Sequence, residues 1–251
     1  MILALPVLFL LSARESASSP DSGVVLIELF TSQGCSSCPP ADRLLSRLAE
    51  DKTLAGRVIP LSFHVDYWNR IGWTDPFSAK RWSDRQRAYA QAFGSNRLYT
   101  PQLVVAGRSD LNGSDEKGIR KEISELLATE PTGQVTLAVE PSGNRLKVKA
   151  GAKLNRASEE ELDLWVAVFE TGLTTQVGAG ENASQTLHND YVVRRLEKVL
   201  SLSGKAGATD SGEVVLGIDK RWNRQNLGVA AFLQDSFTMN VHGAAAKRLA
   251  S

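Results

Sequence analysis

Two cysteines stand just after an apolar, strand-like segment, and this junction constrains the fold more than any other feature of the sequence. Val24–Phe30 is rich in β-forming residues and nearly continuous in apolar ones, which is typical of a strand buried on both faces. A loop containing Cys35-Ser-Ser-Cys38 follows, and Ala41–Glu50 then places its leucines on one helical face. The sequence therefore predicts a strand, a loop and a helix, with both cysteines at the N-terminus of the helix.

Alternating strand and helix patterns continue to about residue 129. The predicted elements are a strand at Arg57–Asp66, a helix at Pro76–Phe93, a hairpin of Tyr99–Ala106 and Arg108–Gly113, and a helix opening at Ser114. The order β-α-β-α-β-β-α, with a parallel pair joined by a crossover helix, is that of the thioredoxin fold. We therefore predict an α/β thioredoxin-like domain over residues 23–130.

Beyond Thr129–Gly133 the sequence changes to period-two patterns separated by turn residues. The predicted strands begin at Val135, Leu146, Leu162, Tyr191, Val214 and Leu227. This arrangement is typical of an antiparallel β-sandwich. Because 251 residues are enough for two domains, we predict an all-β antiparallel sandwich domain over residues 131–251.

The first 22 residues have the hydrophobicity pattern of a signal peptide. Met1–Leu11 is apolar but too short to span a bilayer, and small and polar residues follow it to Ser22. No basic residue precedes the apolar run, so a disordered N-terminus of a cytosolic protein is the alternative. We expect a periplasmic or secreted protein, with no membrane span in the mature chain.

The balance of basic and acidic residues argues against nucleic acid and anionic membranes as partners. The chain has 29 basic and 28 acidic residues, without a block of like charge. It therefore lacks the basic patch that nucleic acid or an anionic membrane surface requires. Proteins or small molecules, in particular thiols and disulfides, are the expected partners, and the sequence does not indicate an oligomeric state.

Cys35 and Cys38 are placed where thiol–disulfide exchange needs them. The N-terminus of a helix favours a thiolate, because its N–H groups and its dipole stabilise negative charge. We expect Cys35 to be the exposed attacking thiol and Cys38 to be the more buried resolving thiol. A structural disulfide is an alternative, although so short a loop gives little entropic stabilisation. A zinc site is another, but the three histidines match no common zinc spacing, and we expect no metal and no cofactor.

Three further positions belong to the predicted site. Pro101 precedes a strand, at the place where this fold typically has a cis proline, and the backbone of Thr100 would position an extended partner. An ordinary proline at the start of a strand is the alternative. At the end of the second strand, Asp66 is a candidate proton acceptor and His64 a candidate for tuning the thiolate or binding a metal. A loop packed by aromatic residues, with Asp66 as its cap, is the alternative for these two.

Several motifs together resemble a known family. They are Glu28–Asp42, Phe63–Trp68, Gly72–Phe77, Arg85–Tyr89 and Tyr99–Gln102, and they resemble the predicted secreted proteins of the domain of unknown function 1223 family. The likeness runs from about Val24 to Ser251 and departs at Ser184-Gln185, where the family usually has Gly-Arg. The resemblance implies a thioredoxin-like fold and supports the assignments of Cys35, Cys38 and Pro101, but it implies no reaction.

The leading hypothesis is an exported thiol–disulfide oxidoreductase. A copper-binding or metallochaperone module that uses Cys35, Cys38 and His64 is one alternative, because thiolates and imidazole suit Cu(I). A non-catalytic envelope binding protein with a structural disulfide is the other.

Overall fold

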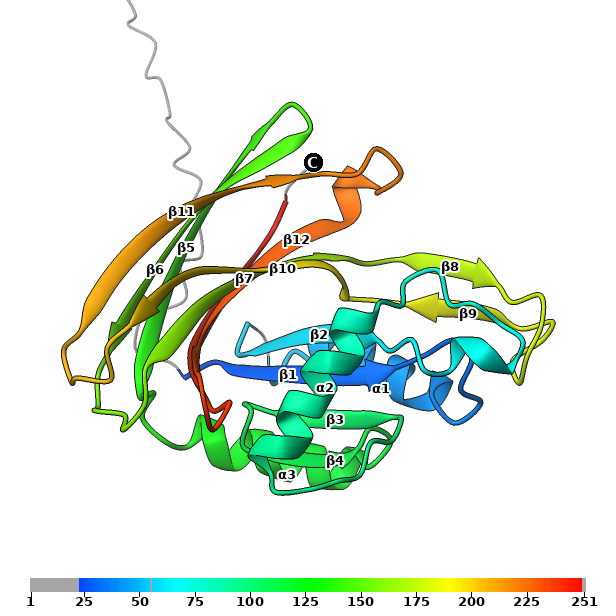
Figure 1. Cartoon of the computed structure of the whole chain (residues 1–251), viewed down its shortest axis with the longest axis horizontal. Coiled ribbons are helices and arrows are strands. Elements are labelled where there is room, and N and C mark those ends of the chain that lie inside the picture. The colour runs from blue at the N-terminus through cyan, green and yellow to red at the C-terminus, as the bar shows by residue number, and fades with distance from the viewer. Residues whose placement is uncertain (1–22, 55, 250–251) are drawn as a thin grey trace, which may run out of the picture.

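The strand that precedes the cysteines is β1 (Val25–Thr31), and every residue of it is buried. The computed structural model describes residues 23–54 and 56–249. The signal-peptide prediction for residues 1–22 therefore lies outside the described residues. The protein is a mixed α/β structure with one large sheet, two smaller ones and few helices (Figure 1).

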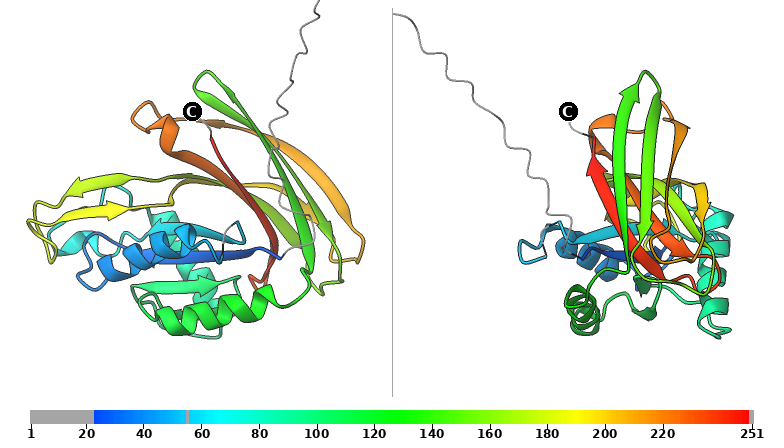
Figure 2. Two further views of the ribbon diagram at one scale, coloured as in Figure 1. Left: turned by 180° about the vertical axis from the view of Figure 1, so that it is seen from behind. Right: turned by 90° about the vertical axis from the view of Figure 1, so that its left-hand side faces the viewer.

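The first half follows the element order expected from the sequence. After β1 come α1 (Pro39–Glu50), β2 (Val58–His64), the 3-10 helix η1 (Asn69–Ile71), α2 (Lys80–Ala92), β3 (Gln102–Val105), β4 (Ser109–Asn112) and α3 (Glu116–Leu127). β2 pairs with β1 in parallel, β3 pairs with β1 antiparallel, and β4 pairs with β3. Figures 1 and 2 show α2 on one face of these strands and α1 and α3 on the other.

The second helix begins later than the sequence analysis expected. Its pattern predicted a start at Pro76, but α2 starts at Lys80. The Asp75 side chain accepts a hydrogen bond from Phe77 N, and its carbonyl accepts one from Ser78 N. These bonds hold the backbone in a turn, so the helix can begin only after it.

The second half consists of strands. They are β5 (Gly133–Ser142), β6 (Arg145–Leu154), β7 (Leu162–Glu170), β8 (Leu173–Gln176), β9 (Thr186–Asn189), β10 (Val192–Leu202), β11 (Thr209–Gly217), β12 (Leu227–Asp235) and β13 (Val241–Arg248), with the 3-10 helix η2 (Arg224–Asn226) before β12. β7 lies between β10 and β12, and both pairings are antiparallel.

Strands from the two halves form one sheet. The order is β13-β12-β7-β10-β2-β1-β3-β4, and β10 joins β2 at the pair Val192 and Ser62. Ser62 N donates to Tyr191 O at 2.8 Å. The strands of the second half thus extend the first sheet, because the open edge of β2 leaves backbone groups that a neighbouring strand satisfies.

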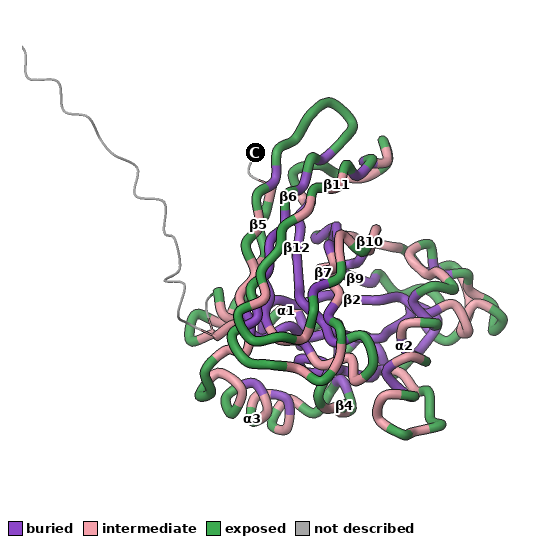
Figure 3. Tube along the Cα trace, turned by 60° about the vertical axis from the view of Figure 1, so that its left-hand side comes forward, coloured by how far each residue is buried: buried purple, intermediate pink, exposed green. Residues whose placement is uncertain are grey.

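A second layer covers the far part of this sheet. β5, β6 and β11 form a three-stranded sheet that packs on β7, β12 and β13 (Figure 1). The core between the layers is built from small and branched apolar residues: Val148, Ala150, Leu164, Val166, Val229 and Leu233. Figure 3 shows the buried residues concentrated in the middle of the strands, whereas the outer end of the β5–β6 hairpin is exposed.

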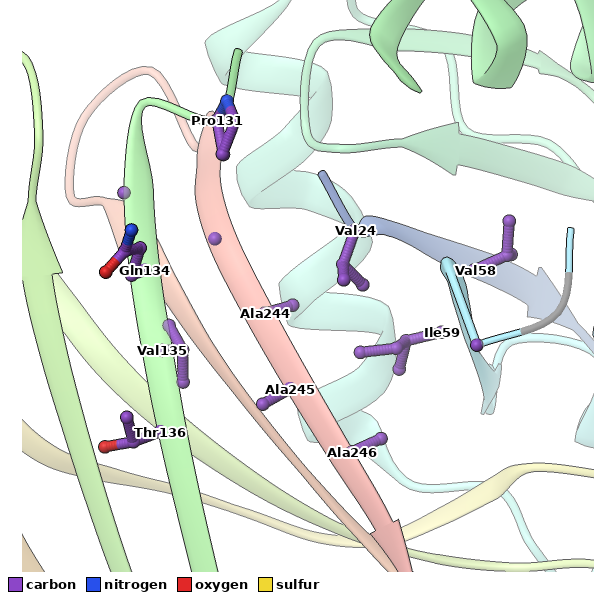
Figure 4. A pocket seen from close by; sticks show the side chains of 13 residues that line it. Val24, Val58, Ile59, Pro131, Gln134, Val135, Thr136, Ala244, Ala245 and Ala246 are labelled. Atoms are coloured by element: carbon purple, nitrogen blue, oxygen red, sulfur yellow. The ribbon is translucent and has the colours of Figure 1, made fainter. Parts of the chain in front are cut away.

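A pocket of about 390 Å³ opens where β5 and β13 meet the beginnings of β1 and β2. Figure 4 shows its mostly small and apolar lining, which includes Val24, Val58, Val135 and Ala245. It lies at the opposite end of β1 from the cysteines, so it does not contribute to the site described below. Within the described residues, no helix is both long and apolar enough to cross a bilayer.

Candidate functional site

Cys35 and Cys38 form a disulfide at the N-terminus of α1, with their Cα atoms 5.4 Å apart. Cys38 is the N-cap residue, and Pro39 and Pro40 form the first turn, which tolerates proline because its N–H groups have no partner within the helix. Both cysteines are fully buried. The expectation that Cys35 is exposed is therefore wrong for the disulfide form.

The turn between β8 and β9 binds the loop that contains Cys35. We call residues 177–185 the strap. Asn182 Nδ2 donates to Gln33 O at 2.9 Å and to Cys35 O at 3.0 Å. Glu181 Oε2 accepts from Ser36 N at 3.0 Å and from Ser36 Oγ at 2.7 Å. The β8–β9 hairpin runs out beside α1 (Figure 2), so two neighbouring residues of the second half hold the loop that contains the cysteines.

Gln33 connects this loop to the arms of the hairpin. Its Nε2 donates to Thr175 Oγ1 at 3.0 Å and to Asn189 Oδ1 at 2.9 Å, and its Oε1 accepts from Trp73 Nε1 at 3.2 Å. The side-chain amide thus has three polar partners. This network fixes the loop before Cys35 from three sides.

A buried ion pair lies beneath the same loop. His64 Nδ1 is 2.7 Å from Asp75 Oδ2, and neither side chain is exposed to solvent. Burial acts against a charged imidazole, but the charge and hydrogen bond of Asp75 and the charge of Asp42 outweigh it and raise the pKa of His64. Asp75 Oδ2 also accepts from Gln33 N at 2.8 Å, so the pair is tied directly to the loop that contains the cysteines.

The same partners act on Asp75 in the opposite direction. Burial opposes its ionised form, but His64 and the N–H groups of Gln33 and Phe77 outweigh burial and lower the pKa of Asp75. Each member of the pair therefore favours the charged form of the other. His64 Nε2 is buried and has no hydrogen-bond partner among the described residues.

Asp42 is a second buried carboxyl beside this pair. It lies on α1 one turn after Cys38, and its backbone N–H donates to Cys38 O at 3.1 Å. Burial raises the pKa of Asp42 to about 6, and the nearby charge of His64 only partly opposes the shift. A carboxyl that titrates near neutral pH, one turn from a cysteine, can accept or return the proton of a thiol.

Thr100 and Pro101 lie where the sequence analysis expected, and the peptide bond between them is cis, as predicted. Thr100 Oγ1 accepts from Trp68 Nε1 at 2.8 Å. A Cβ atom on Gly113 would lie 3.0 Å from both Ala41 Cβ and Pro101 Cβ, which places Pro101 beside the first turn of α1. The structure thus brings Thr100 and Pro101 to the helix end that carries the cysteines.

Asp66 has different surroundings from those assumed in the sequence analysis. Its carboxylate accepts from Ser83 Oγ at 2.5 Å, and its backbone N–H donates to the same hydroxyl at 3.1 Å. These bonds join the end of β2 to α2. Asp66 therefore ties two elements together, whereas Asp42 lies on the helix of the cysteines.

The other two histidines lie elsewhere. His188 Nδ1 is 3.1 Å from Thr174 Oγ1 on the exposed hairpin, and His242 Nδ1 is 3.0 Å from Thr132 Oγ1. No group of three or more His, Cys, Asp or Glu side chains that could hold a metal ion occurs in residues 23–54 and 56–249.

Sequence reasoning missed four residues of the site: Asp42, Asp75, Glu181 and Asn182. Asp42 had a usable signal, because a residue four positions after Cys38 lies on the same side of the helix. Asp75 belongs to the motif Gly72–Phe77, which supports the family resemblance but to which the sequence analysis assigns no role in the site. Glu181 is 145 positions from its partner Ser36, and no local pattern predicts such a contact.

Among solved structures, the chain is similar to the protein AGR_C_4864 from Agrobacterium tumefaciens. The two are 29% identical, with a TM-score of 0.65, and the match covers 91% of this chain and 95% of the other. HBP35 of Porphyromonas gingivalis also has a TM-score of 0.65, at 18% identity, over 91% of this chain and 76% of the other. The second likeness shows a shared fold alone.

Comparison with sequence families and with curated proteins gives one match. No curated protein matches the sequence significantly. The family described as "Protein of unknown function (DUF1223)" matches residues 26–234, which is most of the chain and includes the cysteines and the strap. The chain therefore belongs to this family, as its motifs predicted.

Proposed function

We propose that the protein is a thiol–disulfide oxidoreductase that exchanges the Cys35–Cys38 disulfide with thiols of proteins or small molecules. The observation that carries the proposal is the position of this disulfide at the N-terminus of α1, one turn before Asp42, a carboxyl whose pKa burial raises to about 6. A purely structural disulfide has no use for a titrating group nearby. Exchange benefits from one, because its thiols must lose and regain protons.

The reaction runs in two steps. A thiolate of a dithiol partner attacks Cys35 Sγ, the disulfide breaks, and its electron pair goes to Cys38 Sγ, which takes up a proton. The second thiolate of the partner then attacks the mixed disulfide and releases Cys35. The partner becomes a disulfide, and two electrons and two protons pass to the cysteines. The reverse sequence oxidises a dithiol, with Cys38 as the resolving thiol.

The surrounding residues have distinct roles in this scheme. Asp42 supplies and accepts the proton of Cys38. Burial raises the pKa of Asp42 to about 6, and the nearby charge of His64 opposes this shift, whereas the charge of Asp75 adds to it. Thr100 and Pro101 position the backbone of the partner beside the helix end.

We further propose that residues 23–130 form a thioredoxin-like domain and residues 131–251 a β-sandwich domain whose sheet is continuous with the first. The element order and the cis peptide before Pro101 support the former, and the packing of β5, β6 and β11 on the extended sheet supports the latter. The disulfide also supports a periplasmic or secreted location, since disulfides persist in oxidising compartments.

One observation favours a second candidate function. Both cysteines are fully buried, as expected of the inert disulfide of a non-catalytic envelope binding protein. The two candidates differ in how readily the disulfide is reduced.

The reduction potential separates them. The purified protein is equilibrated in graded glutathione or dithiothreitol buffers, and alkylated thiols are counted by intact mass. A value between about −270 and −120 mV is expected for an exchange enzyme, whereas a value below about −300 mV marks a structural disulfide and would refute the proposal.

Single cysteine variants then assign the steps. Cys35→Ser should abolish exchange with a dithiol substrate. Cys38→Ser should instead accumulate a mixed disulfide at Cys35, because the resolving thiol is missing. Unchanged turnover in Cys35→Ser would contradict the assigned attack.

A further inference from the structure

We propose that the strap is a latch over the disulfide, and that Glu181 is the residue through which reduction of Cys35 releases it. This inference rests on the proposed function in one respect only, that the disulfide is reduced during the working cycle. It specifies how access to the site is regulated and which side chains regulate it.

The strap is a preformed unit. Val177 N donates to Gln185 O at 2.9 Å, Ser184 N donates to Val177 O at 2.9 Å, and Gln185 N donates to Asn182 O at 3.1 Å. These bonds continue the β8–β9 hairpin into a closed turn. Its bonds to the cysteine loop hold this short turn in place, so the amides of the turn exchange more readily once part of that attachment is lost.

Its attachment to the cysteine loop is polar and local. Apart from the bonds of Gln33 to the arms of the hairpin, it consists of the two bonds from Asn182 Nδ2 and the two accepted by Glu181 Oε2. Asn182 is buried, but Glu181 is exposed. An exposed pair of hydrogen bonds contributes little and is easily exchanged for water. Glu181 is accordingly the part of the latch that a small change can release.

The bonds of Glu181 use donors that a thiolate at Cys35 also needs. Pro39 and Pro40 have no N–H, and the N–H of Cys38 donates to Cys35 O, so Ser36 and Ser37 carry the other donors that directly follow Cys35 in the chain. In the disulfide form Glu181 holds both donors of Ser36, while Ser37 Oγ is 3.3 Å from Cys35 Sγ. The same two bonds lower the pKa of Glu181, so its carboxylate is charged when it sits there.

Reduction changes this balance. A dithiol, which becomes a disulfide, or a phosphine, which takes an oxygen from water and becomes a phosphine oxide, supplies two electrons, and the sulfur–sulfur bond breaks. Of the two protons that the dithiol or the water releases, one goes to Cys38 and the other to solvent, so that Cys35 is left as a thiolate beside the helix end. Its negative charge then competes for the Ser36 N–H and repels the carboxylate of Glu181. The carboxylate leaves, and the strap then keeps its two bonds from Asn182 and its packing of Gly178 and Gly180 against Trp73. The strap is thus attached in the oxidised protein and released in the reduced protein.

Hydrogen exchange followed by mass spectrometry tests this directly on the full chain. Peptides that cover residues 177–185 are compared in the oxidised protein and after reduction with a phosphine. We expect strap amides to exchange about two- to fivefold faster in the reduced protein. Equal protection in the two states would overturn the proposal.

Two variants separate charge from the mere loss of the disulfide. Glu181→Gln keeps a hydrogen-bond acceptor but removes the charge, so its strap should show the same exchange in both redox states. Cys35→Ser has neither disulfide nor thiolate at that position, so its strap should stay protected. A Cys35→Ser strap as open as that of the reduced protein would show that bond breakage, and not charge, releases the latch.

Glu159→Gln is the matched control, because it removes an exposed carboxylate outside the strap. It should keep the full redox dependence of exchange. Chemical reduction does not require a protein partner, so the experiment gives an answer even if the measured potential refutes the oxidoreductase function.

Discussion

Two buried clusters have their charged residues in the first half of the protein, and they differ in how completely their polar atoms are partnered. We call Glu28, Arg85, Tyr89 and Gln234 the arginine cluster, and Asp42, His64 and Asp75 the histidine cluster. In the arginine cluster Arg85 Nε and Nη2 donate to the two carboxylate oxygens of Glu28 at 2.6 and 2.9 Å. Tyr89 OH also donates to Glu28, and Gln234 Nε2 donates to Tyr89 OH at 2.9 Å.

The histidine cluster is less complete. His64 has one partner for its two ring nitrogens, and Asp42 is a buried carboxyl that titrates near pH 6. In the arginine cluster, by contrast, Arg85 stays charged and Tyr89 stays neutral, since the pKa of each is raised far from neutrality. The comparison shows that a saturated network fixes a structure, whereas an unsaturated one keeps a proton available.

The largest expected effect comes from breaking the saturated cluster. Arg85→Met leaves the Glu28 carboxylate buried without its cation, so we expect a loss of about 3–5 kcal/mol in the free energy of unfolding. Urea denaturation measures it. The double variant Glu28→Gln with Arg85→Met should recover part of the loss, and the reduction potential of Cys35 and Cys38 should stay unchanged in any variant that folds.

A smaller loss is expected when the histidine cluster is broken. Asp75→Asn removes the charge that raises the pKa of His64, and we expect it to cost about 2–3 kcal/mol at pH 6. The raised pKa stabilises the wild type fully below the ordinary value near 6.5, and this contribution disappears as pH rises through the raised value. The cost should therefore shrink at pH 9. Asp84→Asn, at an exposed ion pair, is the control, with a change below about 0.5 kcal/mol.

Asp42→Asn should increase the free energy of unfolding at neutral pH, whereas Asp75→Asn should decrease it. The raised pKa means that Asp42 stabilises the fold when protonated, and this contribution is lost as pH rises from about 4 through 6. At pH 7 the variant should therefore be more stable than the wild type, by about 2 kcal/mol, and at pH 4 the difference should vanish. Urea unfolding at the two pH values measures this.

The same variant tests the proton transfer. The rate of exchange with a dithiol should lose its dependence on pH near 6 in Asp42→Asn. Asp66→Asn is the matched control, because Asp66 is bonded to Ser83, and its pH profile should stay that of the wild type. If the pH profile changed in Asp66→Asn and not in Asp42→Asn, the proton acceptor would be Asp66, as the sequence analysis suggested.

The smallest expected effect is a gain in the stability of the strap when Ser184 is replaced by glycine. Ser184 has φ +66°, a left-handed conformation that favours glycine, at the position where the family usually has one. Ser184→Gly should therefore stabilise the strap by about 0.5–1 kcal/mol. Slower hydrogen exchange of residues 177–185 in the oxidised variant would measure it, and Ser184→Ala, which keeps the Cβ atom, should show no gain.

The sequence predicted the parts of the site that depend on local order. The cysteines at a helix start, the strand before them and the cis bond before Pro101 all follow from patterns within a few residues or from the order of elements. The attachment of the Cys35 loop does not, because Glu181 and Asn182 reach it from the other half of the chain. Period-two patterns indicate strands but not their neighbours, so the pairing of β10 with β2 could not be predicted either.

That pairing also sets the order in which the protein is assembled. A chain that emerges N-terminus first presents β2 with an open edge until Val192 has followed, and the loop of the cysteines lacks the bonds of Glu181 and Asn182 until these residues have followed. An oxidant that meets the growing chain therefore encounters this loop before the second half binds it, whereas one that meets the finished protein encounters two buried cysteines. The direction of synthesis thus separates the formation of the disulfide from its later use.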